Sequence, residues 1–143
     1  MKVLICNPDK KETAQIEAFV KAFCKKTHFD LDTYVFNSPV DVAACSIRFD
    51  IAIIEVLMED INGITLGNIL TKSIPYIKLI FTSSQVKSLD ESFDVQAIRY
   101  YKRPYTEARF FNGLREAIRR VDIETICFDF KDDGAKVRIC KND

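Results

Sequence analysis

The chain has 143 residues, a length typical of one domain with a short appendage. Hydrophobic residues make up 48% and charged residues 29%, a globular composition that argues against a disordered chain. Lys and Arg total 21, as do Asp and Glu, so the formal net charge is zero. Because nucleic-acid affinity depends mainly on a basic surface, we do not expect this chain to bind DNA or RNA by itself.

Short apolar runs alternate with amphipathic segments along most of the chain. The apolar runs have the length of strands, and the amphipathic segments place apolar residues at spacings of three and four. In chain order the sequence predicts strand 3–6, a helix with an apolar face from Ile16 to Cys24, strand 31–36, a short helix from Ser38-Pro39, strand 51–56, a helix over 64–72, strand 78–82, a weak helix over 88–95, strand 98–101 and a helix from Thr106.

This alternation predicts an α/β fold with one doubly wound parallel sheet and helices on both of its faces. The run Ile51-Ala-Ile-Ile54 is apolar on consecutive positions, as expected for a parallel strand that is buried on both sides. Asp9 and Glu12 have the spacing of a capping box at the start of the first helix.

The end of the chain breaks the alternation. Residues 125–130 and 135–139 have strand character and are separated by Asp133-Gly134, a pair typical of a tight hairpin turn. A lone hairpin is marginal in water and normally belongs to a larger sheet. We therefore expect residues 122–143 to be a linker and the beginning of a second domain that the chain does not contain in full.

The cysteines give no sign of a disulfide framework or a zinc site. Their number is odd and no two form a C-x-x-C pair, which fits a reducing cytoplasm. The sequence also shows no signal peptide and no apolar stretch long enough to cross a bilayer, so we expect a cytoplasmic protein without membrane contact. The cysteines are Cys6, Cys24, Cys45, Cys127 and Cys140.

Polar residues follow several of the predicted strands at the point where each strand ends. Glu55 ends an apolar run, Asn7 and Pro8 follow the first strand, and Ser83 follows the fourth. Arg103 should reach the same edge from the fifth strand. In open parallel sheets this carboxyl edge is where ligands bind, so we expect a functional site there.

With these residues in this order, residues 1–121 resemble the receiver domain of bacterial two-component response regulators. The resemblance is greatest to receivers attached to DNA-binding output domains of the LytTR class, and it extends weakly to the tail from Lys136. It implies a flavodoxin-like (βα)5 fold with strand order 2-1-3-4-5. It also implies a role in phosphorelay signal transduction and transcription regulation.

The resemblance fails at the residues that carry the family's chemistry. The helix-opening Asp-Gly of the family corresponds to Asn62-Gly63. The other positions that it implies are Asn7 and Pro8 for the metal-binding acidic pair, Glu55 for the phosphoacceptor aspartate, Ser83 and Tyr100 for the switch residues, and Arg103 for the invariant lysine.

These substitutions weaken phosphoryl transfer on physical grounds. Magnesium requires several oxygen ligands, whereas proline offers no side-chain ligand and asparagine only a neutral one. The carboxylate of Glu55 also stands one methylene further from the backbone than that of an aspartate, and a misplacement on the order of 1 Å can reduce a rate ~10²-fold. We therefore expect a pseudo-receiver with no enzyme activity, no cofactor and weak or absent Mg²⁺ binding.

Although the family's phosphorylation chemistry is weakened, the opposite charges of Glu55 and Arg103 are both present. We expect Glu55 to form a fork-type ion pair with Arg103, with Ser83 as a nearby hydroxyl donor, which would hold the output face in one state without phosphate. The simpler interpretation, a structural ion pair without a switching role, stays open. Glu59 and Asp60 could join Glu55 in a substitute metal site, but acids in an exposed loop are usually just solvated. His28 lies in a polar turn and is expected to have no functional role.

The resemblance implies homodimerisation through the fourth helix, fifth strand and fifth helix of the family, with Tyr101, Phe111 and Arg115 as candidates on that face. A sensor kinase or another regulatory protein could act on it, and DNA would be contacted only through a C-terminal domain. Two alternatives stay open. One is a receiver that still phosphorylates itself with Mg²⁺ on Glu55 or a serine. The other is a flavodoxin-like cofactor-binding module, although the turn after the first strand lacks glycine.

Overall fold

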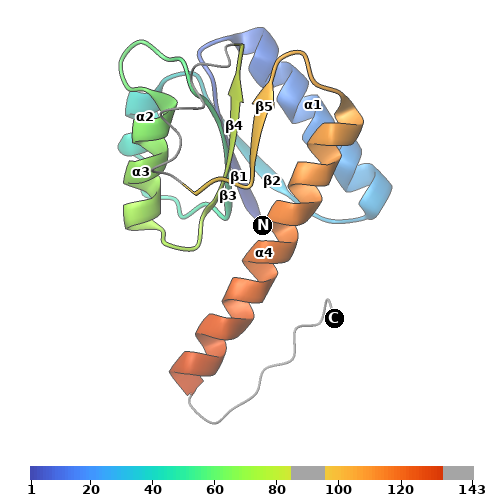
Figure 1. Ribbon diagram of the computed structural model, residues 1–143, viewed down its shortest axis with the longest axis vertical. Coiled ribbons are helices and arrows are strands. Elements are labelled where there is room, and N and C mark those ends of the chain that lie inside the picture. Colours follow the sequence, from blue (N-terminus) through green and yellow to red (C-terminus); the bar gives the residue numbers. More distant parts are fainter. Residues whose placement is uncertain (85–95, 134–143) are drawn as a thin grey trace.

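The computed structural model describes residues 1–84 and 96–133, which form nine helices and strands in an alternating order (Figure 1). The elements are β1 (Lys2–Cys6), α1 (Lys10–Thr27), β2 (Asp32–Phe36), α2 (Pro39–Ala43), β3 (Ile51–Glu55), α3 (Gly63–Ser73), β4 (Lys78–Ser83), β5 (Arg99–Lys102) and α4 (Glu107–Asp133).

The strands form one parallel sheet in the order β2-β1-β3-β4-β5, so the predicted flavodoxin-like fold is confirmed. Every residue of β3 is buried, as its unbroken apolar run predicts. The strand ends are in register at the carboxyl edge, where Glu55 lies opposite Thr82 and Ser83 lies opposite Lys102. This register decides which side chains can meet there.

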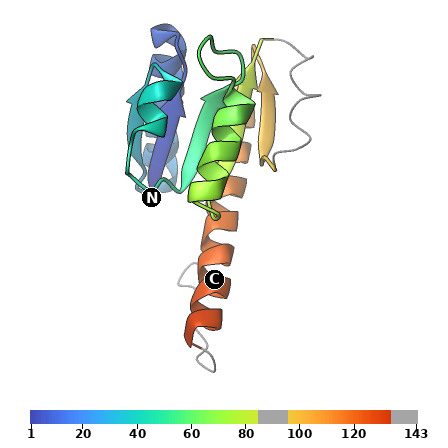
Figure 2. The ribbon, with the colours of Figure 1, turned by 90° about the vertical axis from the view of Figure 1, so that its left-hand side faces the viewer.

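Helices cover both faces of the sheet and enclose two apolar cores (Figures 1 and 2). On one face, residues such as Val3 and Ile53 pack with α1 and α4. On the other face, residues such as Leu4 and Ile54 pack with α2 and α3. Adjacent strand residues therefore point into opposite cores, which is the period-two geometry of a strand that is buried twice.

The helices that follow β1 and β3, α1 and α3, begin with side-chain caps. The carboxylate of Asp9 accepts a 2.8 Å hydrogen bond from the Lys11 N–H, as expected for the first turn of α1. The Asn62 side chain accepts a 2.7 Å bond from the Ile64 N–H. The next residue must be a glycine, because a Cβ atom at Gly63 would meet the Glu55 carbonyl oxygen at 2.1 Å. Both caps fix the loops that border the carboxyl edge.

The predicted hairpin strand over residues 125–130 is wrong, because α4 continues through this segment to Asp133. The helix is already formed over the preceding turns, so each added residue gains a backbone hydrogen bond without a new nucleation cost. In Figures 1 and 2 this end of α4 runs beyond the sheet. The second predicted strand (135–139) and the weak helix (88–95) lie outside the described residues, and the domain boundary at 121 stays a prediction.

No helix among residues 1–84 and 96–133 is long and apolar enough to span a bilayer.

Candidate functional site

The carboxylate of Glu55 is the centre of a polar site at the carboxyl edge of the sheet. Only 4% of the residue is exposed, although it ends β3 next to loops. All buried side-chain polar atoms among the described residues have a hydrogen-bond partner, and Glu55 is no exception. A buried carboxylate is stable only when its charge is compensated, so its partners define the site.

Arg103 supplies the compensating charge as a fork, which confirms the predicted contact. Its Nη1 donates to Glu55 Oε1, and its Nη2 donates to Oε2 at 3.3 Å. The backbone N–H of Arg103 donates to the Ser83 carbonyl at 2.8 Å, which fixes the start of the side chain just beyond β5. The hydrogen bond to Glu55 raises the pKa of Arg103, against a smaller opposing effect of burial.

A hydroxyl that contacts Glu55 belongs to Thr82, which the sequence analysis did not single out. Thr82 Oγ1 donates to Glu55 Oε1 at 3.1 Å. Parallel pairing puts Thr82 directly opposite Glu55, whereas Ser83, one residue later, belongs to the other face of the strand. Sequence reasoning missed Thr82 because two adjacent hydroxyl residues end the run and their register cannot be read locally. The switch role of Ser83 stays a prediction.

Asn7 and the loop after β3 complete the contacts of Glu55. Asn7 Nδ2 lies 3.5 Å from Oε1, and the Leu57 N–H donates to Oε2 at 3.4 Å. The amide oxygen of Asn7 accepts from the Asp9 N–H at 2.9 Å instead of pointing into the site. Asn7 therefore offers Glu55 a donor, which stabilises an anion and does not help to hold a cation.

A second carboxylate, which sequence reasoning did not assign to the site, also lies next to Arg103. Glu12 Oε2 is 3.8 Å from Arg103 Nε, so the guanidinium lies between carboxylates of α1 and β3. The capping-box spacing had suggested a local role for Glu12, because nothing in the sequence shows that the first turn of α1 faces the end of β5. We call Glu55, Arg103, Thr82, Asn7 and Glu12 the ion-pair site.

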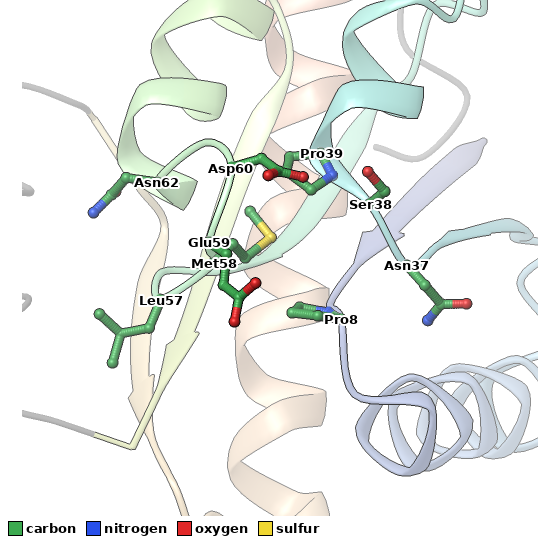
Figure 3. A pocket seen from close by; sticks show the side chains of 9 residues that line it. All are labelled: Pro8, Asn37, Ser38, Pro39, Leu57, Met58, Glu59, Asp60 and Asn62. Atoms are coloured by element: carbon green, nitrogen blue, oxygen red, sulfur yellow. The ribbon is translucent and has the colours of Figure 1, made fainter.

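The described residues contain no group of three or more His, Cys, Asp or Glu side chains that could hold a metal ion. Pro8 is exposed and has no side-chain ligand to offer. Glu59 and Asp60, considered for a substitute metal site, are exposed and line a neighbouring pocket (Figure 3). The chemistry that this arrangement supports is charge pairing, since the side chains nearest Glu55 are donors.

The aromatic residues of β5 divide between the two cores. Tyr100 stacks on Phe81, with ring centroids 5.4 Å apart, and its role as a switch stays a prediction. Tyr101 is only 3% exposed, and its hydroxyl donates to the Arg109 carbonyl at 2.5 Å. A Cβ at Gly113 would meet that hydroxyl at 2.1 Å, so this glycine allows the ring to lie under α4.

Two of the three residues expected on the dimer face are buried. Tyr101 and Phe111 are buried in the core beneath α1 and α4, and Phe111 packs edge-on against Phe23. Arg115 is exposed, but its guanidinium lies over the Phe23 ring on the side of α1. Tyr101 and Phe111 were therefore wrong as surface contacts, because Tyr101 turns inward on β5 and Phe111 lies on the apolar side of α4. Arg115 and the dimer face itself stay predictions.

Comparisons with known proteins agree on the fold. No family model matches the chain, and no curated protein matches it. Solved structures do: the CheY-like receiver domain protein from Methanospirillum hungatei JF-1 has a TM-score of 0.71 at 16% identity, over 86% of this chain and 97% of that one. The signal receiver domain of a modulated diguanylate cyclase from Desulfovibrio desulfuricans G20 has a TM-score of 0.72 at 19% identity, over 86% and 97%.

The chain has the fold of a response-regulator receiver domain. A third structure, the Thermotoga maritima response regulator DrrB, described as an OmpR/PhoB homologue, matches with a TM-score of 0.72 at 14% identity. The match covers 83% of this chain and 52% of that one, so this chain spans about half of that protein. At such identities the likeness concerns the backbone, and the site must be judged from its own residues.

Proposed function

We propose that this chain is a signalling module of the receiver fold that works through the Glu55–Arg103 ion pair instead of aspartyl phosphorylation. In this proposal the chain is cytoplasmic, has no catalytic activity of its own, and controls an attached DNA-binding domain of the LytTR class. Homodimerisation carries the signal, and a sensor kinase or another regulatory protein supplies it.

One observation supports the proposal above the others: both oxygens of the buried Glu55 carboxylate are already engaged by Arg103. Thr82 donates to the same carboxylate. A nucleophile for phosphoryl transfer must be free to attack and must lie beside a cation with open coordination positions. The oxygens of Glu55 are engaged by donors, and Asn7 and Pro8 after β1 supply no carboxylate for a cation, so the site fits charge pairing.

The pair also gives the module a means of coupling its elements. Arg103 follows β5 directly, Glu55 ends β3, and Glu12 belongs to α1. The charge-assisted fork from Arg103 to Glu55 fixes the end of β5 relative to β3, and the contact with Glu12 links it to α1. A change in this pair would move the β5–α4 connection, which is the direction that an output signal would take.

The first test separates this proposal from a receiver that still phosphorylates itself. The chain is incubated with Mg²⁺ and acetyl phosphate, and its intact mass is measured. We expect no added phosphoryl group on the wild type or on Glu55→Gln. A gain of one phosphoryl group on the wild type that is lost in Glu55→Gln would contradict the proposal and support phosphorylation of Glu55.

The second test asks whether the pair carries a signal. Glu55→Gln and Arg103→Gln are introduced into the full-length protein, and dimerisation and transcription from its promoter are measured. We expect both variants to shift these outputs in the same direction. The matched control is Glu116→Gln, which removes a carboxylate from an exposed pair with Arg119 and Arg120. Unchanged output in both site variants would leave Glu55 with a structural role.

A further inference from the structure

A pocket lies next to the ion-pair site on the side of α2 and α3, between three loops at the carboxyl edge (Figure 3). One wall is the loop that follows Glu55, and the other is formed by the residues after β1 and β2. The residues that line this loop pocket are Pro8, Asn37, Ser38, Pro39, Leu57, Met58, Glu59, Asp60 and Asn62.

The surface of the loop pocket combines apolar contacts with negative charge. Pro8, Pro39 and Met58 provide apolar atoms, and Met58 is anchored by a 3.9 Å contact between its sulfur and that of the buried Cys6. In Figure 3 the Glu59 and Asp60 carboxylates lie with Met58 on the side of the loop that faces Pro8 and Pro39. Among the described ion pairs, none involves either carboxylate.

This chemistry fits a long cationic side chain. Arg and Lys have an aliphatic stem that packs on apolar surface and a charged head that pairs with carboxylates. A purely apolar ligand would leave two charges beside it without compensation, and an anionic ligand would be repelled. Charge complementarity thus selects a cationic group flanked by apolar residues over the other classes of occupant.

Both walls of the loop pocket connect to Glu55. On one side, the Leu57 N–H donates to Glu55 Oε2, and the Gly63 N–H donates to the Val56 carbonyl at 2.8 Å, so the loop starts and ends at the site. On the other side, Asn37 Nδ2 donates at 2.9 Å to the carbonyl of Asn7, whose own side chain reaches Glu55. A ligand that shifts either wall would therefore shift a partner of Glu55.

We propose that the loop pocket receives an Arg or Lys side chain from an apolar segment of a partner protein, and that this binding is coupled to the Glu55–Arg103 pair. The coupling rests on the proposed function of that pair, whereas the chemistry of the partner rests on the loop pocket alone. If partner binding shifts the equilibrium of the pair, then by thermodynamic linkage the state of the pair alters the affinity for the partner by the same factor.

The partner's chemistry is tested with a phage-displayed library of random heptapeptides. Peptides are selected on the immobilised wild-type chain after depletion on Glu59→Gln/Asp60→Asn, and the Kd of enriched peptides is measured by fluorescence anisotropy. We expect enrichment of Arg or Lys next to apolar residues and roughly tenfold weaker binding to the double variant, as removal of two partly exposed ion pairs implies. The control is Asp30→Asn/Asp32→Asn, which removes two exposed charges near the amino end of β2 and should bind like the wild type.

Three results would overturn this part of the proposal: no enriched peptide, enriched peptides without a cation, or equal binding to Glu59→Gln/Asp60→Asn and the wild type. A fourth is self-association of the wild type that Glu59→Gln/Asp60→Asn abolishes, since the occupant would then be a second copy of the chain.

The coupling is tested with the same peptides on Glu55→Gln. We expect their Kd to change about fivefold or more, which corresponds to a coupling at the lower end of the usual range. An unchanged Kd would refute the coupling. Failure of the proposed function gives a different result, namely unaltered dimerisation and promoter output of Glu55→Gln in the absence of any peptide, so the two failures can be told apart.

Discussion

Removal of the Arg103 side chain should destabilise the chain more than removal of any exposed charge, because it leaves the Glu55 carboxylate buried without its cation. Breaking a buried ion pair from one side costs about 3–5 kcal/mol. The Arg103 side chain is 23% exposed, against 4% for Glu55, so water can partly replace the guanidinium. We therefore expect Arg103→Ala to lower the free energy of unfolding by about 2–3 kcal/mol.

The decisive variant removes both charges. In Glu55→Leu/Arg103→Leu no buried charge is left unpaired, and such replacements are often neutral or stabilising. We expect the double variant to be more stable than Arg103→Ala but less stable than the wild type, because the buried donors Thr82 and Asn7 lose their acceptor. The comparison thus separates the cost of an orphaned charge from the loss of packing.

The assay is urea unfolding followed by far-UV circular dichroism, because the chain contains no Trp for fluorescence. Equal m-values would show that the variants unfold from comparable compact states. Arg120→Ala is the matched control: Arg120 is 51% exposed in its pair with Glu116, and its loss should change stability by less than about 1 kcal/mol. An Arg103→Ala effect as small as this control, or a double variant less stable than Arg103→Ala, would refute the reasoning.

Three further predictions concern backbone and titration. Gly63→Ala should destabilise the fold by roughly 1–3 kcal/mol in urea unfolding, because its Cβ would meet the Glu55 carbonyl at 2.1 Å; wild-type stability would show that the loop yields freely. His28→Gly should be stabilising by about 0.5–1 kcal/mol, since His28 ends α1 with a φ of 57° that favours glycine, and a lower midpoint would contradict this. Burial raises the pKa of Tyr105 from 10.0 to about 12, so its neutral form stabilises the fold fully below pH 10, and this contribution is lost as pH rises toward 12; melting at pH 8 and 11 should show a smaller alkaline loss for Tyr105→Phe.

The strands and the central pair could be predicted from sequence because each depends on a strong local pattern. Consecutive apolar residues in β3 allow only a strand that is buried on both faces, and the parallel topology then brings Glu55 and the residue after β5 to one edge. The opposite charges of Glu55 and Arg103 then lie at the same edge of the sheet and pair across the end of β4, which separates β3 from β5. These steps require only the position at which each strand ends, and not the residue-by-residue pairing between strands.

The predictions that failed depend on a single-residue register or on competition between local structures. Thr82 and Ser83 differ only in which face of β4 they occupy, and the pairing with Glu55 decides this. Tyr101 turned inward because Gly113 leaves room for its hydroxyl beneath α4. Residues 125–130 have strand character, yet an established helix extended through them. None of these outcomes can be read from the segment itself.

The geometry also constrains where a signal could enter. Glu55 already uses both oxygens, so a stimulus cannot act by filling an empty position on that carboxylate. It must instead change the partners that surround the pair, and the loop after Glu55 is one described segment that both contacts the carboxylate and borders a pocket. In this scheme Glu59 and Asp60 sense the input, whereas Glu55 and Arg103 transmit it.

Glu59→Gln/Asp60→Asn should therefore abolish the response to a partner while leaving unstimulated output intact, and Glu55→Gln should alter output even without a partner. Reversed phenotypes would place the sensor at the buried pair and leave the loop pocket without a role in signalling.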